Sequence, residues 1–246
     1  MSGVLVLDRG NYSLKGALIE SGTIVKRWER RSIDERGAIG EILNSSSPEG
    51  VAFSSVVPRW TSSFIRELRK RGIEQVVEVS AGISLPFRLL VEEPEKVGPD
   101  RLSAAAGAVD IGKREAIIID AGTAITVDSL SSQGFMGGAI FPGIDLIVRS
   151  LHDGTAVLPL IGNDSETIAL PGRNTEEAIK AGTVWGLIGA VKELVQQSRK
   201  SLSSSAAILV TGGGAGTIAL YLAESVSLEP DLIFNGLHHL FKLNTA

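Results

Sequence analysis

The feature that most limits the fold of this chain is a short pattern that occurs twice. Residues 4–11 read VLVLDRGN, and residues 116–123, which lie 112 positions further on (4 to 116), read AIIIDAGT. Each copy is an apolar run ending in Asp-x-Gly and a polar residue, and each is followed by an alternating stretch, at 13–19 and 124–130. Similarity at a fixed offset indicates an internal duplication, although two short apolar strands can also resemble each other by chance.

The rest of the pattern predicts an α/β chain with two similar domains, residues 1–112 and 113–246. Runs rich in β-branched residues predict strands, and apolar residues at helical spacing predict helices. Further strands are expected at 23–28, 51–57, 76–79, 206–211 and 232–235, with a glycine-rich strand pair at 134–142. Helices are expected at 35–43, 60–72, 100–109, 175–199 and 237–243.

Composition excludes several classes of function. The chain of 246 residues has a formal net charge of -4 and no cysteine, so we expect no nucleic-acid surface, no disulfide and no thiolate metal site. No apolar run approaches the roughly 20 residues of a membrane span, and the N-terminus lacks the basic residues of a signal peptide. The three histidines show no metal-ligand spacing. We therefore expect a cytoplasmic protein without a membrane partner.

The loop after the first strand has the composition of a phosphate-binding turn. In Asp8-Arg9-Gly10-Asn11, the glycine lets the backbone approach a ligand, and successive N–H groups can point at phosphate oxygens. Asp8 would then lie near a magnesium ion, through water, and Lys15 could neutralise phosphate charge. The alternative is an ordinary hairpin closed by an Asx turn. With its echo at Asp120, the pattern favours two facing Asp-x-Gly loops that hold a nucleotide.

Two other segments could carry chemistry. Asp100 and Arg101 stand together at an expected helix start, where the guanidinium favours the ionised carboxylate and that carboxylate can accept a hydroxyl proton. The alternative is a helix-capping aspartate beside a solvated arginine. The stretch TGGGA at 211–215 follows a strand and opens a helix. It lacks the spacing and the downstream acid of a dinucleotide fingerprint, which excludes a Rossmann dehydrogenase.

Taken in order, eight segments resemble the type III pantothenate kinases, a family of actin-like kinases of the ASKHA superfamily. They are DRGNYSLK at 8, GPDR at 98, DAGTAITVD at 120, GGAIFPG at 137, TAVLP at 155, GRNTEEAIKAG at 172, TGGGA at 211 and PDLIFNGL at 230. The resemblance implies a duplicated ribonuclease H-like fold with a nucleotide cleft between two similar domains. It also implies ATP-dependent phosphorylation of pantothenate to 4′-phosphopantothenate, the first step of coenzyme A biosynthesis.

The resemblance further implies roles for single residues. Asp100 would accept the proton of the pantothenate hydroxyl, and Asp120 would hold a monovalent cation, potassium or ammonium, in addition to the Mg²⁺ that accompanies ATP. Thr175 would contact pantothenate from the other subunit of a homodimer. The implied ATP-binding residues are Asp8, Arg9, Gly10, Asn11, Tyr12, Ser13, Leu14, Lys15 and Thr123, and the other implied substrate-binding residues are Gly98, Pro99, Asp100 and Arg101.

The chain departs from the family's pattern at one position. The family usually has a substrate-contacting tyrosine nine positions before the proton acceptor, and this chain has Val91 there. The departure bears on substrate affinity more than on the type of reaction. It leaves open a kinase of the same fold that acts on another small hydroxyl compound. A non-catalytic regulatory accessory factor is the other alternative, against which the intact Asp8, Asp100 and Asp120 argue.

Overall fold

A computed structural model describes residues 3–30, 35–162, 168–222 and 225–245. By its contacts the chain divides into two compact units. The first unit is Met1–Arg114, Leu130–Gly137 and Asp231–Ala246, and the second is Glu115–Ser129 and Gly138–Pro230. Compact units need not coincide with the halves of a sequence repeat, and here the C-terminal segment belongs with the first unit. The domains 1–112 and 113–246 therefore stay a prediction based on the repeat.

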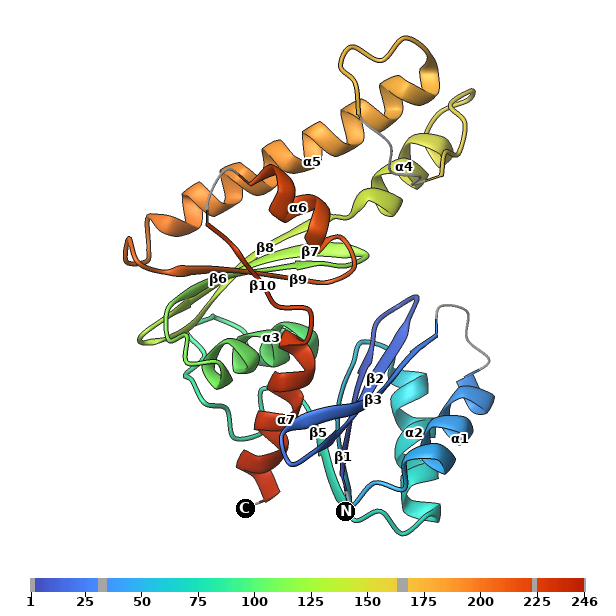
Figure 1. Ribbon diagram of the computed structural model, residues 1–246, viewed down its shortest axis with the longest axis vertical. Coiled ribbons are helices and arrows are strands. Elements are labelled where there is room, and N and C mark those ends of the chain that lie inside the picture. Colours follow the sequence, from blue (N-terminus) through green and yellow to red (C-terminus); the bar gives the residue numbers. More distant parts are fainter. Residues whose placement is uncertain (1–2, 31–34, 163–167, 223–224, 246) are drawn as a thin grey trace. The chain divides into compact units, whose positions relative to one another are not determined.

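A five-stranded sheet in the order β3-β2-β1-β4-β5 forms the centre of the first unit (Figure 1). Its strands β1 and β2 are antiparallel, as are β2 and β3, whereas β4 runs parallel to both β1 and β5. The strands are β1 (Val4–Arg9), β2 (Leu14–Glu20), β3 (Thr23–Arg30), β4 (Gly50–Ser55) and β5 (Gln75–Glu78). The helices are α1 (Glu35–Ser46), α2 (Pro58–Lys70), α3 (Pro99–Asp110) and α7 (Leu232–Thr245), with a short 3-10 turn at Pro94–Lys96.

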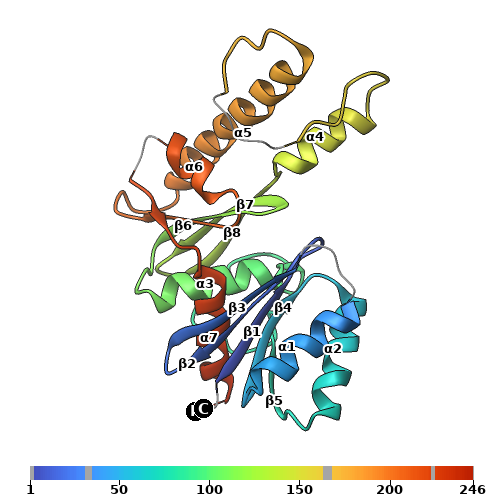
Figure 2. The same cartoon turned by 45° about the vertical axis from the view of Figure 1, so that its right-hand side comes forward.

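Both faces of this sheet are buried, which explains why β1 is apolar almost throughout. Because side chains alternate along a strand, Leu5 and Leu7 pack on one face with side chains of α1 and α2. These two helices lie on the same side of the sheet (Figure 2). Val4 and Val6 pack on the other face against α3 and α7. Burial on both sides fixes the register of β1, and so fixes where its polar end emerges.

The second sheet has the order β10-β9-β6-β7-β8 (Figure 1). Its strands are β6 (Ala116–Ala121), β7 (Ala124–Ser131), β8 (Gly134–Pro142), β9 (Ala207–Thr211) and β10 (Ser227–Leu228). The helices of the second unit are α4 (Ile144–Asp153), α5 (Thr175–Arg199) and α6 (Ala215–Tyr221). Apolar side chains of α5 and α6 cover one face of this sheet and form a single core with β6, β7 and β9.

The two sheets have the same topology. The second sheet, read from its other edge, has the order β8-β7-β6-β9-β10. If the strands of each sheet are numbered one to five along the chain, both sheets have the order 3-2-1-4-5. The first and fourth strands are parallel in both. In both, one or two helices follow the third strand, one follows the fourth and one follows the fifth. The internal duplication predicted from the repeat, and with it the α/β class, are confirmed.

The structure corrects the sequence predictions in two places. Residues 232–235, predicted as a strand, form the first turn of α7, whose buried Leu232, Gly236, Leu237 and Leu240 follow helical spacing. Residues 134–142 form one strand, not a pair. The helix α4 was not predicted. Within the described residues, no helix is both long and apolar enough to cross a membrane.

Candidate active site

Asp8 lies at the end of β1, where the neighbouring strands place polar groups beside it. In the sheet register Asp8 stands opposite Ser54 of β4 and opposite Lys15 of β2. The Ser54 hydroxyl, which is fully buried, donates a hydrogen bond of 2.6 Å to Asp8 Oδ1. Burial raises the pKa of Asp8 from its ordinary 3.8 to about 6, even though the Ser54 hydrogen bond and Lys15 lower it.

Asp100 is brought into the same region of the first unit. It lies in the first turn of α3, and the backbone N–H of Arg101 donates to its Oδ1 at 2.9 Å. The Asp100 carboxylate is close enough to Asp8 to contribute to the raised pKa of Asp8. A side chain at position 98 would collide with the Asp100 carboxylate, so Gly98 leaves room for that carboxylate in its present position. Asp8 is therefore within electrostatic reach of Lys15, on the neighbouring strand β2, and of Asp100, which is distant in sequence.

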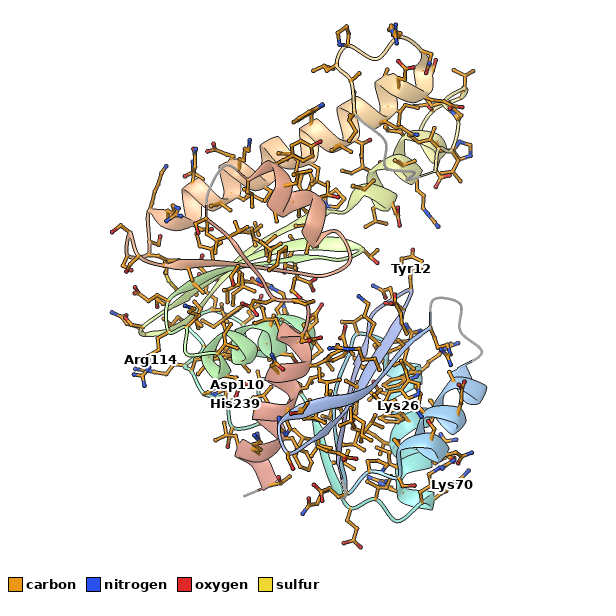
Figure 3. All side chains as sticks on the ribbon, viewed as in Figure 1. Tyr12, Lys26, Lys70, Asp110, Arg114 and His239 are labelled. Carbon is orange, nitrogen blue, oxygen red and sulfur yellow. The ribbon has the colours of Figure 1, made fainter. Side chains whose placement is uncertain are left out.

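The Arg9 side chain stabilises the loop between β1 and β2 through hydrogen bonds to the loop backbone. This side chain is buried, and its Nη1 donates to the carbonyl groups of Gly10 and Ser13, the second at 3.3 Å. Leu14 is also fully buried, so any contact of Leu14 with a nucleotide would use its backbone. By contrast, Tyr12 is half exposed and projects from the turn (Figure 3).

The second unit repeats this arrangement around Asp120. Asp120 stands opposite Thr211 in the register of β6 and β9, as Asp8 stands opposite Ser54. The N–H of Gly214 donates to the carbonyl of Ala121 at 2.9 Å, and the N–H of Val56 donates to that of Arg9 at 3.1 Å. Arg9 and Ala121 are equivalent in the repeat, so the duplication extends to the hydrogen bonds of the loops.

Glycines allow the loops of the second unit to touch. Gly212 has a φ of +89°, and a side chain there would collide with Asp120 and with the backbone of Ala121. The N–H of Gly143, just before α4, donates to the carbonyl of Thr123 at 2.9 Å, which leaves the Thr123 side chain exposed. Backbone hydrogen bonds thus join the loop at 120–123 to the segments at 142–143 and 211–214.

The site residues fit a magnesium ion better than they fit a closed protein cage. Among the described residues, no group of three or more His, Asp or Glu side chains could hold a metal. Mg²⁺ commonly uses one or two carboxylates, waters and substrate phosphates. Asp8, partly buried and beside a second carboxylate, fits that role, with water between the ion and its oxygens.

Comparison with known proteins agrees with this geometry. The sequence profile described as type III pantothenate kinase matches residues 4–197. The chain belongs to the type III pantothenate kinase family. A type III pantothenate kinase of Chlorobaculum parvum is 32% identical over 98% of this chain and 95% of its own length. One from Halorhodospira halophila is 34% identical over 96% of both chains.

Solved structures support the fold of this family member. A Campylobacter jejuni protein assigned to the Baf family of transcriptional activators has a TM-score of 0.64 at 20% identity and covers 98% of both chains. A ROK family glucokinase of Streptomyces griseus, solved with glucose and AMPPNP, has a TM-score of 0.56 at 12% identity over 99% of both chains. The predicted duplicated actin-like fold and the resemblance to this family are confirmed.

Sequence reasoning missed Ser54 as a candidate site residue, and it singled out Thr211 only as part of the TGGGA segment at 211–215. Both are buried hydroxyl residues at the ends of parallel strands, beside Asp8 and Asp120 respectively. Nothing marks Ser54 within its apolar run until β4 is paired with β1. Comparison of the two halves could have identified Ser54, because each half has a strand that ends in Ser or Thr and pairs with the strand that carries the Asp-x-Gly sequence.

The residues implied in substrate binding are divided between the two units. Gly98, Pro99, Asp100 and Arg101 lie at the start of α3 in the first unit. Thr175 is exposed at the first position of α5 in the second unit, after Asn174, whose side chain accepts a hydrogen bond from the N–H of Glu177. The roles of these residues, and those of the ATP-binding set, stay predictions.

Proposed function

We propose that this family member transfers the γ-phosphate of ATP to the 4′-hydroxyl of pantothenate, the first step of coenzyme A biosynthesis, in the cytoplasm. The observation that carries the proposal is that Asp100, in the first turn of α3, lies within electrostatic reach of Asp8, near the end of β1, in the first unit. A kinase must bring a phosphate-binding loop and a base for the acceptor hydroxyl together. Asp8 begins the loop in this proposal, and Asp100 is the base. Family membership names the acceptor.

The proposed roles follow from where the groups lie. Asp100 accepts the proton of the pantothenate hydroxyl as the oxygen attacks phosphorus, and the N–H of Arg101 holds one of its oxygens in place. Lys15, opposite Asp8, neutralises phosphate charge. Bound Mg²⁺, held near Asp8 through water, would supply further neutralisation of the phosphates. Positioning and electrostatics supply most of the catalysis in phosphoryl transfer, so this small set of groups is sufficient.

A coupled ADP-release assay with and without pantothenate and potassium tests the function. Asp100→Asn should lower turnover by about 10²–10⁴-fold, because a base of this kind contributes about that much. Asp110→Asn is the matched control: the same substitution at the other end of α3, where the carboxylate pairs with His239 at 3.0 Å (Figure 3). Pantothenate-independent ADP release, or near-normal turnover in folded Asp100→Asn, would contradict the proposal.

We infer a homodimer whose active sites are shared, because Thr175 resembles a residue that the family supplies from the partner chain. Asp100→Asn homodimers lack the base, and Thr175→Arg homodimers have an obstructed pocket. A mixed two-fold dimer puts both lesions in one site and leaves the other intact. Co-expression with two tags makes about half of the dimers mixed, so about a quarter of wild-type activity should return. Purified mixed dimers without activity would contradict shared sites.

Asp120 is the proposed ligand of a monovalent cation. Its carboxylate lies beside the Gly212 backbone at the end of β6, and a single carboxylate with backbone groups suits a weakly held ion. The alternative acceptor is another small hydroxyl compound, which Val91 keeps open. The same ADP-release assay with a panel of small alcohols separates that alternative from pantothenate.

A further inference from the structure

Phe135 contacts two segments of the first unit that lie on the pantothenate side of the proposed site: residues 88–90, which lead to Val91, and Arg101 at the start of α3. It is fully buried in β8. Its N–H donates to the carbonyl of Arg88 at 2.8 Å, and its carbonyl accepts from the N–H of Leu90 at 2.8 Å. Residues 88–90 therefore run beside Phe135 as a short parallel bridge, although no regular strand forms there.

The glycines on either side of Phe135 bring that segment close. A side chain at Gly134 would collide with the backbone of Arg88. A side chain at Gly137, where φ is +87°, would lie 3.2 Å from Val91 Cγ1. The backbone of β8 thus holds residues 88–91, which end at the position where the family usually has a substrate-contacting tyrosine.

The ring of Phe135 meets the start of α3. The Arg101 guanidinium lies over this ring, with its carbon Cζ 5.5 Å from the ring centroid. That distance is within the range of a cation–π interaction. The Phe87 ring also packs against Phe135, with 6.2 Å between the ring centroids, whereas the ring beneath the guanidinium is that of Phe135. Arg101 immediately follows the proposed base, Asp100.

We propose that Phe135 is a positioning residue, which holds the Arg101 guanidinium where it can pair with the carboxylate of pantothenate. This inference rests on the proposed function. An arginine side chain has many rotamers, and fixing it on binding costs affinity. A guanidinium already held over a ring loses less freedom when it pairs with a carboxylate. The backbone of the same residue holds the segment that ends at Val91, so one residue orders both sides of the substrate.

Calorimetric titration of pantothenate, with a saturating non-hydrolysable ATP analogue, tests this role. Phe135→Leu removes the ring and keeps the backbone bonds, so pantothenate affinity should fall by about 5- to 30-fold. The affinity for the ATP analogue should stay within about 2-fold, because Phe135 contacts residues 88–90 and Arg101, which belong to the pantothenate side of the site. Phe87→Leu is the matched control: the same substitution in the neighbouring ring should leave pantothenate affinity within about 2-fold of wild type.

Fluorinated phenylalanines at position 135 provide a second test that preserves shape. Fluorine removes negative charge from the ring face, so successive fluorination should weaken pantothenate binding stepwise while the fold is kept. A pantothenate affinity that is independent of fluorination would overturn the proposal, as would equal losses for Phe135→Leu and Phe87→Leu. A wild-type protein that neither binds pantothenate nor phosphorylates it would instead overturn the proposed function, and the two failures are therefore distinct.

Discussion

Asp8→Asn should make the protein more stable at neutral pH while it removes activity. The Asp8 carboxyl is partly buried, and burial, together with the charge of Asp100, raises its pKa to about 6. A charged Asp8 therefore destabilises the ligand-free fold. Asparagine has the same shape, carries no charge, and keeps a carbonyl oxygen that can accept the hydroxyl hydrogen of Ser54. This is the pattern of a functional group kept at a cost in stability.

The magnitude follows from the pKa. The difference between 3.8 and about 6 corresponds to about 3 kcal/mol when Asp8 is ionised in both the folded and unfolded states. Because the folded pKa is the higher one, the stability that Asp8 contributes is present below pH 3.8 and is lost as pH rises through about 6. The advantage of Asp8→Asn should therefore be about 3 kcal/mol at pH 8 and about 1 kcal/mol at pH 4.5.

Urea unfolding of ligand-free protein at the two pH values measures this difference. Tryptophan fluorescence reports mainly the first unit, where Trp28 and Trp60 are both buried. The exposed Asp153, at the end of α4, supplies the control Asp153→Asn, which should change stability by less than about 0.5 kcal/mol at either pH. A gain for Asp8→Asn that is the same at both pH values, or a loss at pH 8, would refute the reasoning.

Three other outcomes are expected. Ser54→Ala should weaken binding of the magnesium–ADP complex by about 10-fold or more, because a hydrogen bond to the Asp8 carboxylate is lost, whereas Ser54→Thr should keep much of the affinity. Calorimetric titration measures both affinities, and an unchanged affinity in Ser54→Ala would remove Ser54 from the site. Turnover in sodium-only buffer should be lower than in potassium or ammonium at constant ionic strength, and equal rates would exclude a cation role for Asp120. Val91→Tyr should lower the KM for pantothenate by up to about 10-fold through a new hydrogen bond, and an unchanged KM would mean that Val91 does not occupy the tyrosine's place.

The repeat predicted that the two halves share a fold, and both sheets do begin with an apolar strand that is buried on two faces. An apolar strand that ends abruptly in Asp-x-Gly has one register in such a sheet, so Asp8 and Asp120 could be placed at strand ends before the fold was known. The starts of α3 and α5 were also predictable, since Pro99 and Asn174 are typical of helix starts.

Other features depend on packing that the sequence does not display. The run Leu232 to Asn235 is too short to distinguish a strand from a helix, and only its burial against α3 decides for helix. The hydrogen bond between Ser54 and Asp8 requires the pairing of two strands that are distant in the chain. The contact between Arg101 and Phe135 likewise joins α3 to β8, and no spacing rule predicts it.

The repeat also shows how two similar halves came to differ in chemistry. The position equivalent to Lys15 is Val127, which is buried in the second unit's core. In each half a Pro-Asp pair stands at the start of the helix that follows the fifth strand: Pro99-Asp100 opens α3, and Pro230-Asp231 directly precedes α7. Asp231 is therefore the counterpart of Asp100. Asp231 is engaged by Arg27, whose Nη2 donates to its Oδ2 at 2.8 Å. The charged groups suited to phosphate neutralisation and proton transfer therefore remain in the first half, while the second half keeps the backbone loop.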